Sequence, residues 1–112
     1  MNNEAIKKIA DTYGFSEQSR QLYEEMAELI IATNKAYRLQ KINICPFFDE
    51  VAMERKNAFN NVIEEMADVT IMLEQIKYLL HISDTDINEI IEQKLNRQLE
   101  RIERNERIER HS

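Results

Sequence analysis

The chain has 112 residues and a formal net charge of −6, and charged residues make up 32 % of it. This length favours a single domain over residues 1–112, and the acidic balance disfavours nucleic-acid binding, because phosphate contacts need a basic surface. The single cysteine, Cys45, excludes an internal disulfide. We see no signal-peptide pattern and no long apolar run, so we expect a cytoplasmic protein without membrane contact.

The scarcity of turn residues predicts an all-α fold. The chain has one Gly and one Pro, which removes most turn punctuation and favours helices joined by few loops. In chain order, we expect a short helix over about 4–12 that ends before Gly14, and then a long helix over about 17–41. The segment 43–49 breaks the pattern with a proline, and Asp49 is a good N-cap for the helix that follows.

The second half of the chain predicts two further helices, one over about 50–80 and one with its apolar stripe over about 87–102. Asp86, followed three residues later by Glu89, resembles a capping box at the start of the last helix. The chain ends in ERIERNERIERHS, where Glu and Arg recur every three residues. We expect a solvated helical end with intrahelical ion pairs, partly frayed over about 103–112. The expected fold is therefore a bundle of four to five helices.

One acidic phrase occurs twice, because residues 24–29 read EEMAEL and residues 64–69 read EEMADV. A helix advances about 100° per residue, which places each acid relative to the apolar stripe of its own helix. In each phrase the first Glu, Glu24 or Glu64, points away from the stripe. The second Glu and the acid three residues later lie within the stripe or at its edge. These four inward acids are Glu25, Glu28, Glu65 and Asp68.

Inward carboxylates need a compensating partner. A buried, unpaired carboxylate is costly, its pKa rises, and several that converge also repel one another. A divalent cation is the usual remedy, and ligands that are all oxygens favour Mg²⁺, with Mn²⁺ as a substitute, over Zn²⁺. The alternative is that these acids pair with internal Lys or Arg or lie at a polar rim. A di-iron site is disfavoured, because it needs Glu-x-x-His pairs and neither His81 nor His111 completes one.

The two phrases and their surroundings resemble a known family. EEMAEL followed by EEMADVTIMLEQI is similar to the MazG-like, all-alpha nucleoside triphosphate pyrophosphohydrolases, which carry ExxE on one helix and ExxD on another. The later KLNRQLERI resembles the basic final-helix segment of small MazG-like proteins, so that the resemblance covers about residues 13–103. It implies a helical bundle that forms a homodimer or homotetramer. It also implies Mg²⁺ bound by Glu25, Glu28, Glu65 and Asp68.

The implied reaction is hydrolysis of a nucleoside triphosphate between its α and β phosphates, which yields the monophosphate and pyrophosphate. Divalent ions suit this chemistry, because they neutralise the triphosphate, activate water and stabilise the leaving group. A carboxylate that is not fully used as a ligand would orient the water as general base, and Glu25 or Glu28 is our candidate. The acids do not select the nucleotide, since related dimeric dUTPases and phosphoribosyl-ATP pyrophosphohydrolases use similar acids.

Four residues outside the acidic phrases are candidates for substrate binding. Lys94 falls within the apolar stripe of the last helix with Arg97 beside it, and both would contact phosphates. The alternative for Lys94 is an apolar stem with its charge at the rim. Asn61 lies one turn before Glu65, and Gln18 lies shortly before the first phrase, so either would contact the substrate. A plain polar rim is the alternative that we favour for Asn61.

Further alternatives remain open. Phe47 and Phe48 either stack on a base or, as we favour, pack in the core or between subunits. The segment around them is long in comparison with the family and is expected to shape the base pocket. The alternative for the chain as a whole is a non-catalytic helical dimerisation or adaptor module. Its apolar stripes and its ERIERNERIER end favour this alternative. A family member that binds nucleotide without cleaving it is a third reading.

Overall fold

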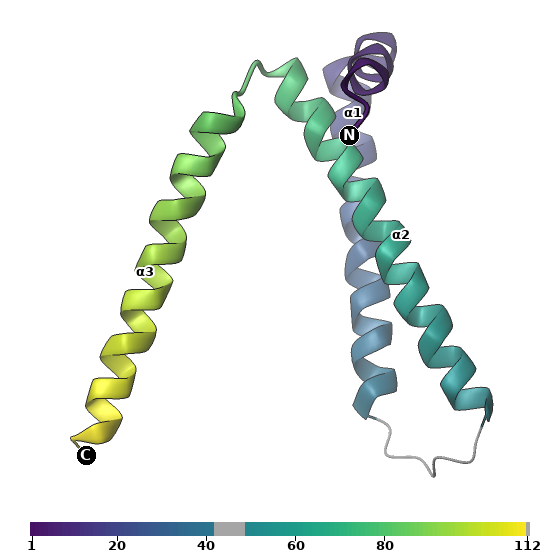
Figure 1. The fold of residues 1–112 in the computed structure, drawn as a ribbon. Coiled ribbons are helices and arrows are strands. Elements are labelled where there is room, and N and C mark those ends of the chain that lie inside the picture. The colour runs from purple at the N-terminus through teal and green to yellow at the C-terminus, as the bar shows by residue number, and fades with distance from the viewer. Residues whose placement is uncertain (42–48, 112) are drawn as a thin grey trace. The chain divides into compact units, whose positions relative to one another are not determined.

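In the computed structural model, which describes residues 1–41 and 49–111, the chain forms three α-helices and, within these ranges, no strand. The helices are α1 (Asn3–Lys41), α2 (Asp49–Leu79) and α3 (Asp84–Arg110), as Figure 1 shows. The all-α prediction is confirmed. Cys45, Phe47 and Phe48 lie outside the described residues, so their predicted roles stay predictions, as does the single domain over the whole chain.

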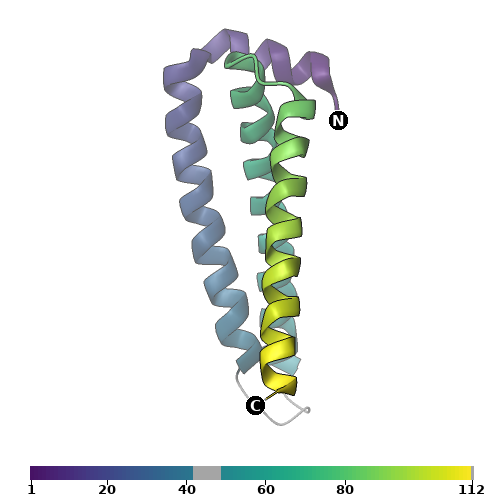
Figure 2. The same cartoon turned by 90° about the vertical axis from the view of Figure 1, so that its left-hand side faces the viewer.

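The prediction of four to five helices is wrong, because the first two expected helices are one helix with a kink. Gly14 has φ 84° and ψ 170°, and the backbone is helical on both sides of it. This conformation is nearly restricted to glycine, so a single residue redirects the helix without a loop. Figure 2 shows the segment before Gly14 turned away from the rest of α1.

α1 and α2 run antiparallel and pack against each other within the unit Met1–Leu80. The buried apolar residues that the structure describes in this unit are alanines or have unbranched or branched aliphatic side chains, with no aromatic residue. Two buried amides, Gln18 and Gln75, accompany these apolar residues. The segment before the kink is tied to the end of α2, since the Tyr78 hydroxyl donates to Asp11 at 2.8 Å. The buried apolar residues are Ile6, Ala10, Ala32, Leu39, Ala58 and Met72.

α3 belongs to the unit His81–Ser112 and has no buried residue. Its N-cap is Ser83, whose Oγ accepts a hydrogen bond from the Asp86 backbone N–H at 3.1 Å. The predicted capping box at Asp86 is therefore wrong, since the helix begins about one turn earlier. Ser83, which is also a preferred N-cap residue, caps it instead. Arg107 and Glu103 form one of the expected intrahelical ion pairs. None of the described helices has the length and apolar character needed to cross a membrane.

Candidate metal centre

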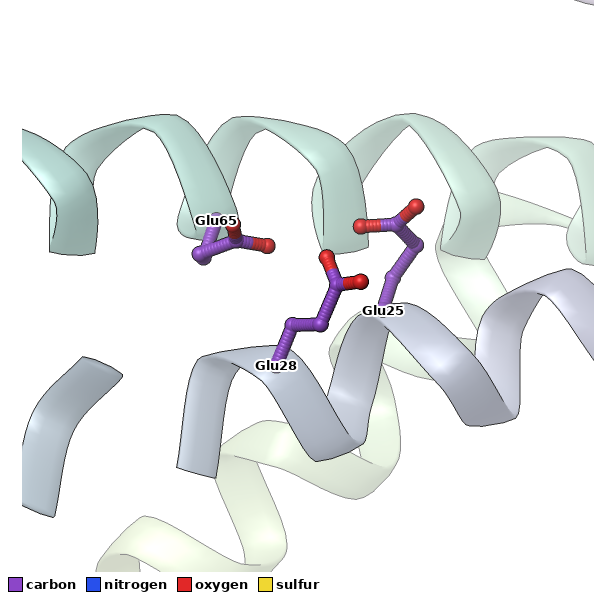
Figure 3. A group of neighbouring side chains, drawn as sticks. All are labelled: Glu25, Glu28 and Glu65. Atoms are coloured by element: carbon purple, nitrogen blue, oxygen red, sulfur yellow. The ribbon is translucent and has the colours of Figure 1, made fainter. Parts of the chain in front are cut away.

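Three of the four predicted inward acids come together where α1 and α2 face each other. Glu25 and Glu28 lie three residues apart on one face of α1, and Glu65 reaches them from α2 (Figure 3). One carboxylate oxygen from each of the three lies within 4.8 Å of the others. Glu24 and Glu64 are exposed, as predicted. The duplicated phrase thus supplies a cluster of oxygens from two helices. The second Glu of each phrase belongs to the cluster, and Glu28 is its third member.

One acid of the cluster is held in place by a neighbour on its own helix. Gln21 lies four residues before Glu25, and its Nε2 donates to Glu25 Oε1 at 2.8 Å. The other oxygen, Glu25 Oε2, is buried and has no hydrogen-bond partner among the described residues. Gln21 therefore fixes one end of the carboxylate and leaves the opposite oxygen available. The i, i+4 spacing of an amide and an acid was the sequence signal for this contact.

The surroundings of Glu65 disfavour the charged form of its carboxyl group. Burial is the main cause that raises its pKa above the ordinary value of 4.5, followed by the negative charge of Glu28 and a hydrogen bond with it. The charges of Asp68 and Glu25 raise the pKa further. Glu65 Oε2 is also buried without a partner in the described part of the chain. Without a cation, the charged form of Glu65 is therefore less favourable than that of an isolated carboxyl group.

Asp68 lies beside the cluster and outside it. Its charge reaches Glu65, but its side chain is exposed and is not one of the three that converge. Asp68 has one methylene fewer than the corresponding Glu28, which shortens its reach by about 1.5 Å. Its role as a fourth ligand stays a prediction.

The chemistry of these oxygens fits a hard divalent cation. Across residues 1–41 and 49–111, no Lys or Arg forms an ion pair with Glu25, Glu28 or Glu65, so internal cations do not compensate them there. Two buried oxygens lack partners among these residues, which is costly unless a proton or a cation meets them. The donors are carboxylate oxygens alone, the ligand type that Mg²⁺ and Mn²⁺ prefer.

The predicted substrate contacts on the hairpin lie in two different settings. Gln18 is 7 % exposed and donates from Nε2 to Gln75 Oε1 at 2.6 Å, so its amide joins the two helices. It also lines a pocket of about 420 Å³ together with Arg20 and Gln21. Asn61 is exposed on α2, one turn before Glu65. Gln18 thus has a structural role, and its contact with a substrate stays a prediction.

Lys94 and Arg97 are both exposed on α3. Lys94 lines an apolar depression of about 400 Å³ with Ile87 and Ile90, which confirms its predicted place within the apolar stripe. Contact of either cation with phosphate stays a prediction.

Comparison with known proteins finds no relative of this chain. No protein-family model matches it, and no curated protein and no solved structure matches it either. The resemblance to the MazG-like family therefore depends on the residues of the two phrases and on the later KLNRQLERI segment alone.

Proposed function

We propose that the chain is a Mg²⁺-dependent hydrolase, a diverged member of the MazG-like family, that converts a nucleoside triphosphate to the monophosphate and pyrophosphate. The observation that carries the proposal is the convergence of Glu25, Glu28 and Glu65, with two buried oxygens that lack a partner in the described residues. The convergence supports a cation site, and the resemblance of the two phrases supplies the reaction.

Glu25, Glu28 and Glu65 would bind the cation, with Asp68 as the fourth acid. When bound, Mg²⁺ would neutralise the triphosphate and stabilise the leaving pyrophosphate. Gln21 positions Glu25 by holding its Oε1, so that Oε2 keeps one direction. Glu28 is the exposed member of the cluster and can therefore meet solvent. We assign to Glu28 the role of general base, which orients the attacking water and takes its proton.

The pocket that contains Gln18 and Gln21 supports substrate binding on the same side as Glu28. Gln21 and Glu28 are seven residues apart, which is about two helical turns and the same face of α1. The pocket also contains Arg20, whose guanidinium suits a phosphate, and Tyr13, whose ring suits a base. Glu17 and Glu24 line it as well, so a triphosphate would need the cation to offset their charge. Asn61, Lys94 and Arg97 are further proposed contacts.

A panel of canonical and modified nucleoside triphosphates, incubated with the protein and Mg²⁺, tests the proposal through release of pyrophosphate. The matched variants are Glu65→Gln, inside the cluster, and Glu64→Gln, its exposed neighbour. We expect Glu65→Gln to lower the rate by at least about 100-fold, because a lost charge-stabilising group typically costs that much. Glu64→Gln should keep the wild-type rate. Absence of pyrophosphate from every nucleotide, or full activity of Glu65→Gln, would contradict the proposal.

A non-catalytic adaptor module is the second candidate, favoured by the large apolar side chains that all three helices expose. Thermal unfolding with and without Mg²⁺ separates the candidates, because a ligand that binds only the folded state raises the melting temperature. An adaptor should show no shift. A member of the family that binds nucleotide without cleaving it should show the shift but release no pyrophosphate.

A further inference from the structure

Two buried glutamines join α1 to α2 within the hairpin. Gln18 is 7 % exposed and Gln75 is 1 % exposed. Gln18 Nε2 donates a hydrogen bond to Gln75 Oε1 at 2.6 Å, and Gln75 Nε2 donates to the sulfur of Met72 at 3.7 Å. A buried amide is costly without partners, so the two side chains depend on each other.

The apolar packing around this pair does not by itself define the register of the two helices. Every seventh residue from Gln18 to Leu39 is buried or half-buried, and the same holds on α2 from Ala58 to Leu79. Because these repeats recur along each helix, a helix displaced by one turn still packs apolar side chains against apolar side chains. The half-buried residues between the repeats are also apolar: Leu22, Leu29 and Ala36 on α1, and Val62, Val69 and Ile76 on α2.

The acids disfavour the observed register. Glu28 and Glu65 face each other across the hairpin, with carboxylate oxygens within 4.8 Å. A displacement of α1 by four residues, which is about 6 Å, would place Ala32 opposite Glu65 and move Glu28 away. Like charges repel at this range, so in the absence of a cation another contact must hold the two acidic phrases together.

The glutamine pair has the same register as the facing acids. Gln18 lies ten residues before Glu28 on α1, and Gln75 lies ten residues after Glu65 on α2. In antiparallel helices, equal spacings in opposite directions along the chain cover the same distance along the pair. The hydrogen bond between the glutamines and the approach of the acids therefore require one and the same alignment of the helices.

A displacement by one turn would separate the two amides. Leu79 would then lie opposite Gln18, and Leu22 would lie opposite Gln75. Both amides would lose their partner among apolar side chains, which is the costly case for a buried polar group. A buried polar contact can fix the register of paired helices in this way, at a cost in stability.

Other hydrogen bonds join α1 to α2 nearer the ends of the hairpin. The Tyr78 hydroxyl donates to Asp11 before the kink, and Arg55 Nε donates to the Leu39 carbonyl at 3.0 Å. The side chains of Asp11 and Arg55 are exposed, so water can replace their partners after a displacement. The buried glutamines have no such replacement.

We propose that Gln18 and Gln75 are positioning residues of the cation site, because their hydrogen bond sets the register that brings Glu25 and Glu28 to Glu65. The inference rests on the proposed function for the role of that site. It adds that a contact outside the cluster determines whether the site forms, since Gln18 lies seven residues, or about 10 Å along the helix, from Glu25.

Replacing both amides separates positioning from stability. Gln18→Met with Gln75→Met keeps the unbranched length of both side chains, and it should melt at or above the wild-type temperature, because neither partner is left alone. Each single variant should melt at a lower temperature, because one buried amide then lacks its partner. Despite its stability, the double variant should bind Mn²⁺ at least about tenfold more weakly. Gln40→Met, the same exchange at an exposed position of α1, should keep the wild-type affinity.

Distances between two spin labels measure the register without metal. The labels are attached through Tyr23→Cys on α1 and Met53→Cys on α2, both exposed positions, in a chain that also carries Cys45→Ser. An excess of unlabelled chain restricts the measured distances to single chains. With a chelator present, the double Met variant should give a distribution that is shifted or broadened by about 6 Å, one helical turn, relative to the otherwise unchanged chain.

An unchanged label distance in the double Met variant overturns the inference. Wild-type affinity for Mn²⁺ in a displaced hairpin overturns it as well, because the register would then not matter to the site. If circular dichroism shows that the double Met variant is unfolded, Gln18→Leu with Gln75→Leu takes its place, with the same expectations. A wild type that binds no Mn²⁺ contradicts the proposed function, whereas the label distances decide independently whether the glutamine pair sets the register.

Discussion

The two acidic phrases share their first four letters, yet their environments differ. Position i−4 is Gln21 before Glu25 and Asn61 before Glu65, and only the longer Gln side chain forms a hydrogen bond with its acid. Glu25 therefore has one partnered oxygen, whereas burial and the negative charge of Glu28 raise the pKa of Glu65. The amides at this position differ in length by one methylene, and the longer one donates a hydrogen bond to its acid.

The comparison makes Gln21 a positioning residue for the cation site. Gln21→Ala removes the hydrogen-bond donor to Glu25 Oε1, so that neither Glu25 nor Glu65 would accept a hydrogen bond from the amide four residues before it. Loss of a group that orients a metal ligand typically lowers metal affinity by about 10–100-fold. Isothermal titration with Mn²⁺ measures this change, and Gln40→Ala, an exposed glutamine at the far end of α1, is the control. An unchanged affinity in Gln21→Ala would show that Glu25 needs no support.

Glu65→Gln should stabilise the metal-free protein at neutral pH. The pKa of Glu65 is higher in the folded state than 4.5, so the folded state binds the proton more tightly than the unfolded state. The free energy of unfolding therefore falls as pH rises from 4.5 through the folded-state pKa, and stays lowered above it. Thermal unfolding across this range, in the presence of a chelator, should show a gain for Glu65→Gln only above pH 4.5.

Glu64→Gln is the control for this pH dependence, because Glu64 is exposed and outside the cluster. It should follow the wild-type curve. If Glu65→Gln is less stable than the wild type at neutral pH without metal, then Glu65 is not strained.

Asn61→Gln should make the second phrase resemble the first. The longer amide would reach Glu65 as Gln21 reaches Glu25, and a hydrogen bond to the charged form lowers a carboxyl pKa. We expect the pH-dependent loss of stability to become smaller and the affinity for Mn²⁺ to rise roughly two- to threefold, because a single hydrogen bond contributes little net free energy. The same titration and unfolding curves measure both effects. No change in either measurement would mean that the length of the amide side chain at this position does not cause the different environments of Glu25 and Glu65.

Asp68→Glu gives the smallest expected change. The added methylene would let this exposed acid reach the cluster, as Glu28 does from α1. In the metal-free protein a fourth carboxylate should raise the pKa of Glu65 further by like-charge repulsion. Carbon-13 NMR of labelled Glu carboxyls would measure that pKa, and a fall or no change would place Asp68 too far away.

Helical spacing predicted which acid of each phrase turns inward, and it predicted the extent of the second expected helix to within about two residues. It did not predict that Gly14 kinks a helix, because a glycine followed by Phe15 and then by polar residues resembles both a helix end and a kink. Ser83 and Asp86 are both preferred cap residues, so composition alone did not choose between them. Helical angles alone did not predict the contact between Gln21 and Glu25 or the position of Asp68 outside the cluster. Both depend on the length of the side chains, which the angle does not describe.

The most direct test of the central claim is titration of Mn²⁺ into three proteins at neutral pH: the wild type, Glu65→Gln and Glu64→Gln. The duplicated phrase forms one cation site from its inward acids, so the wild type and Glu64→Gln should bind with the same affinity. Glu65→Gln should show at least about tenfold weaker binding. Equal affinity in all three proteins, or no binding by the wild type, would contradict the account.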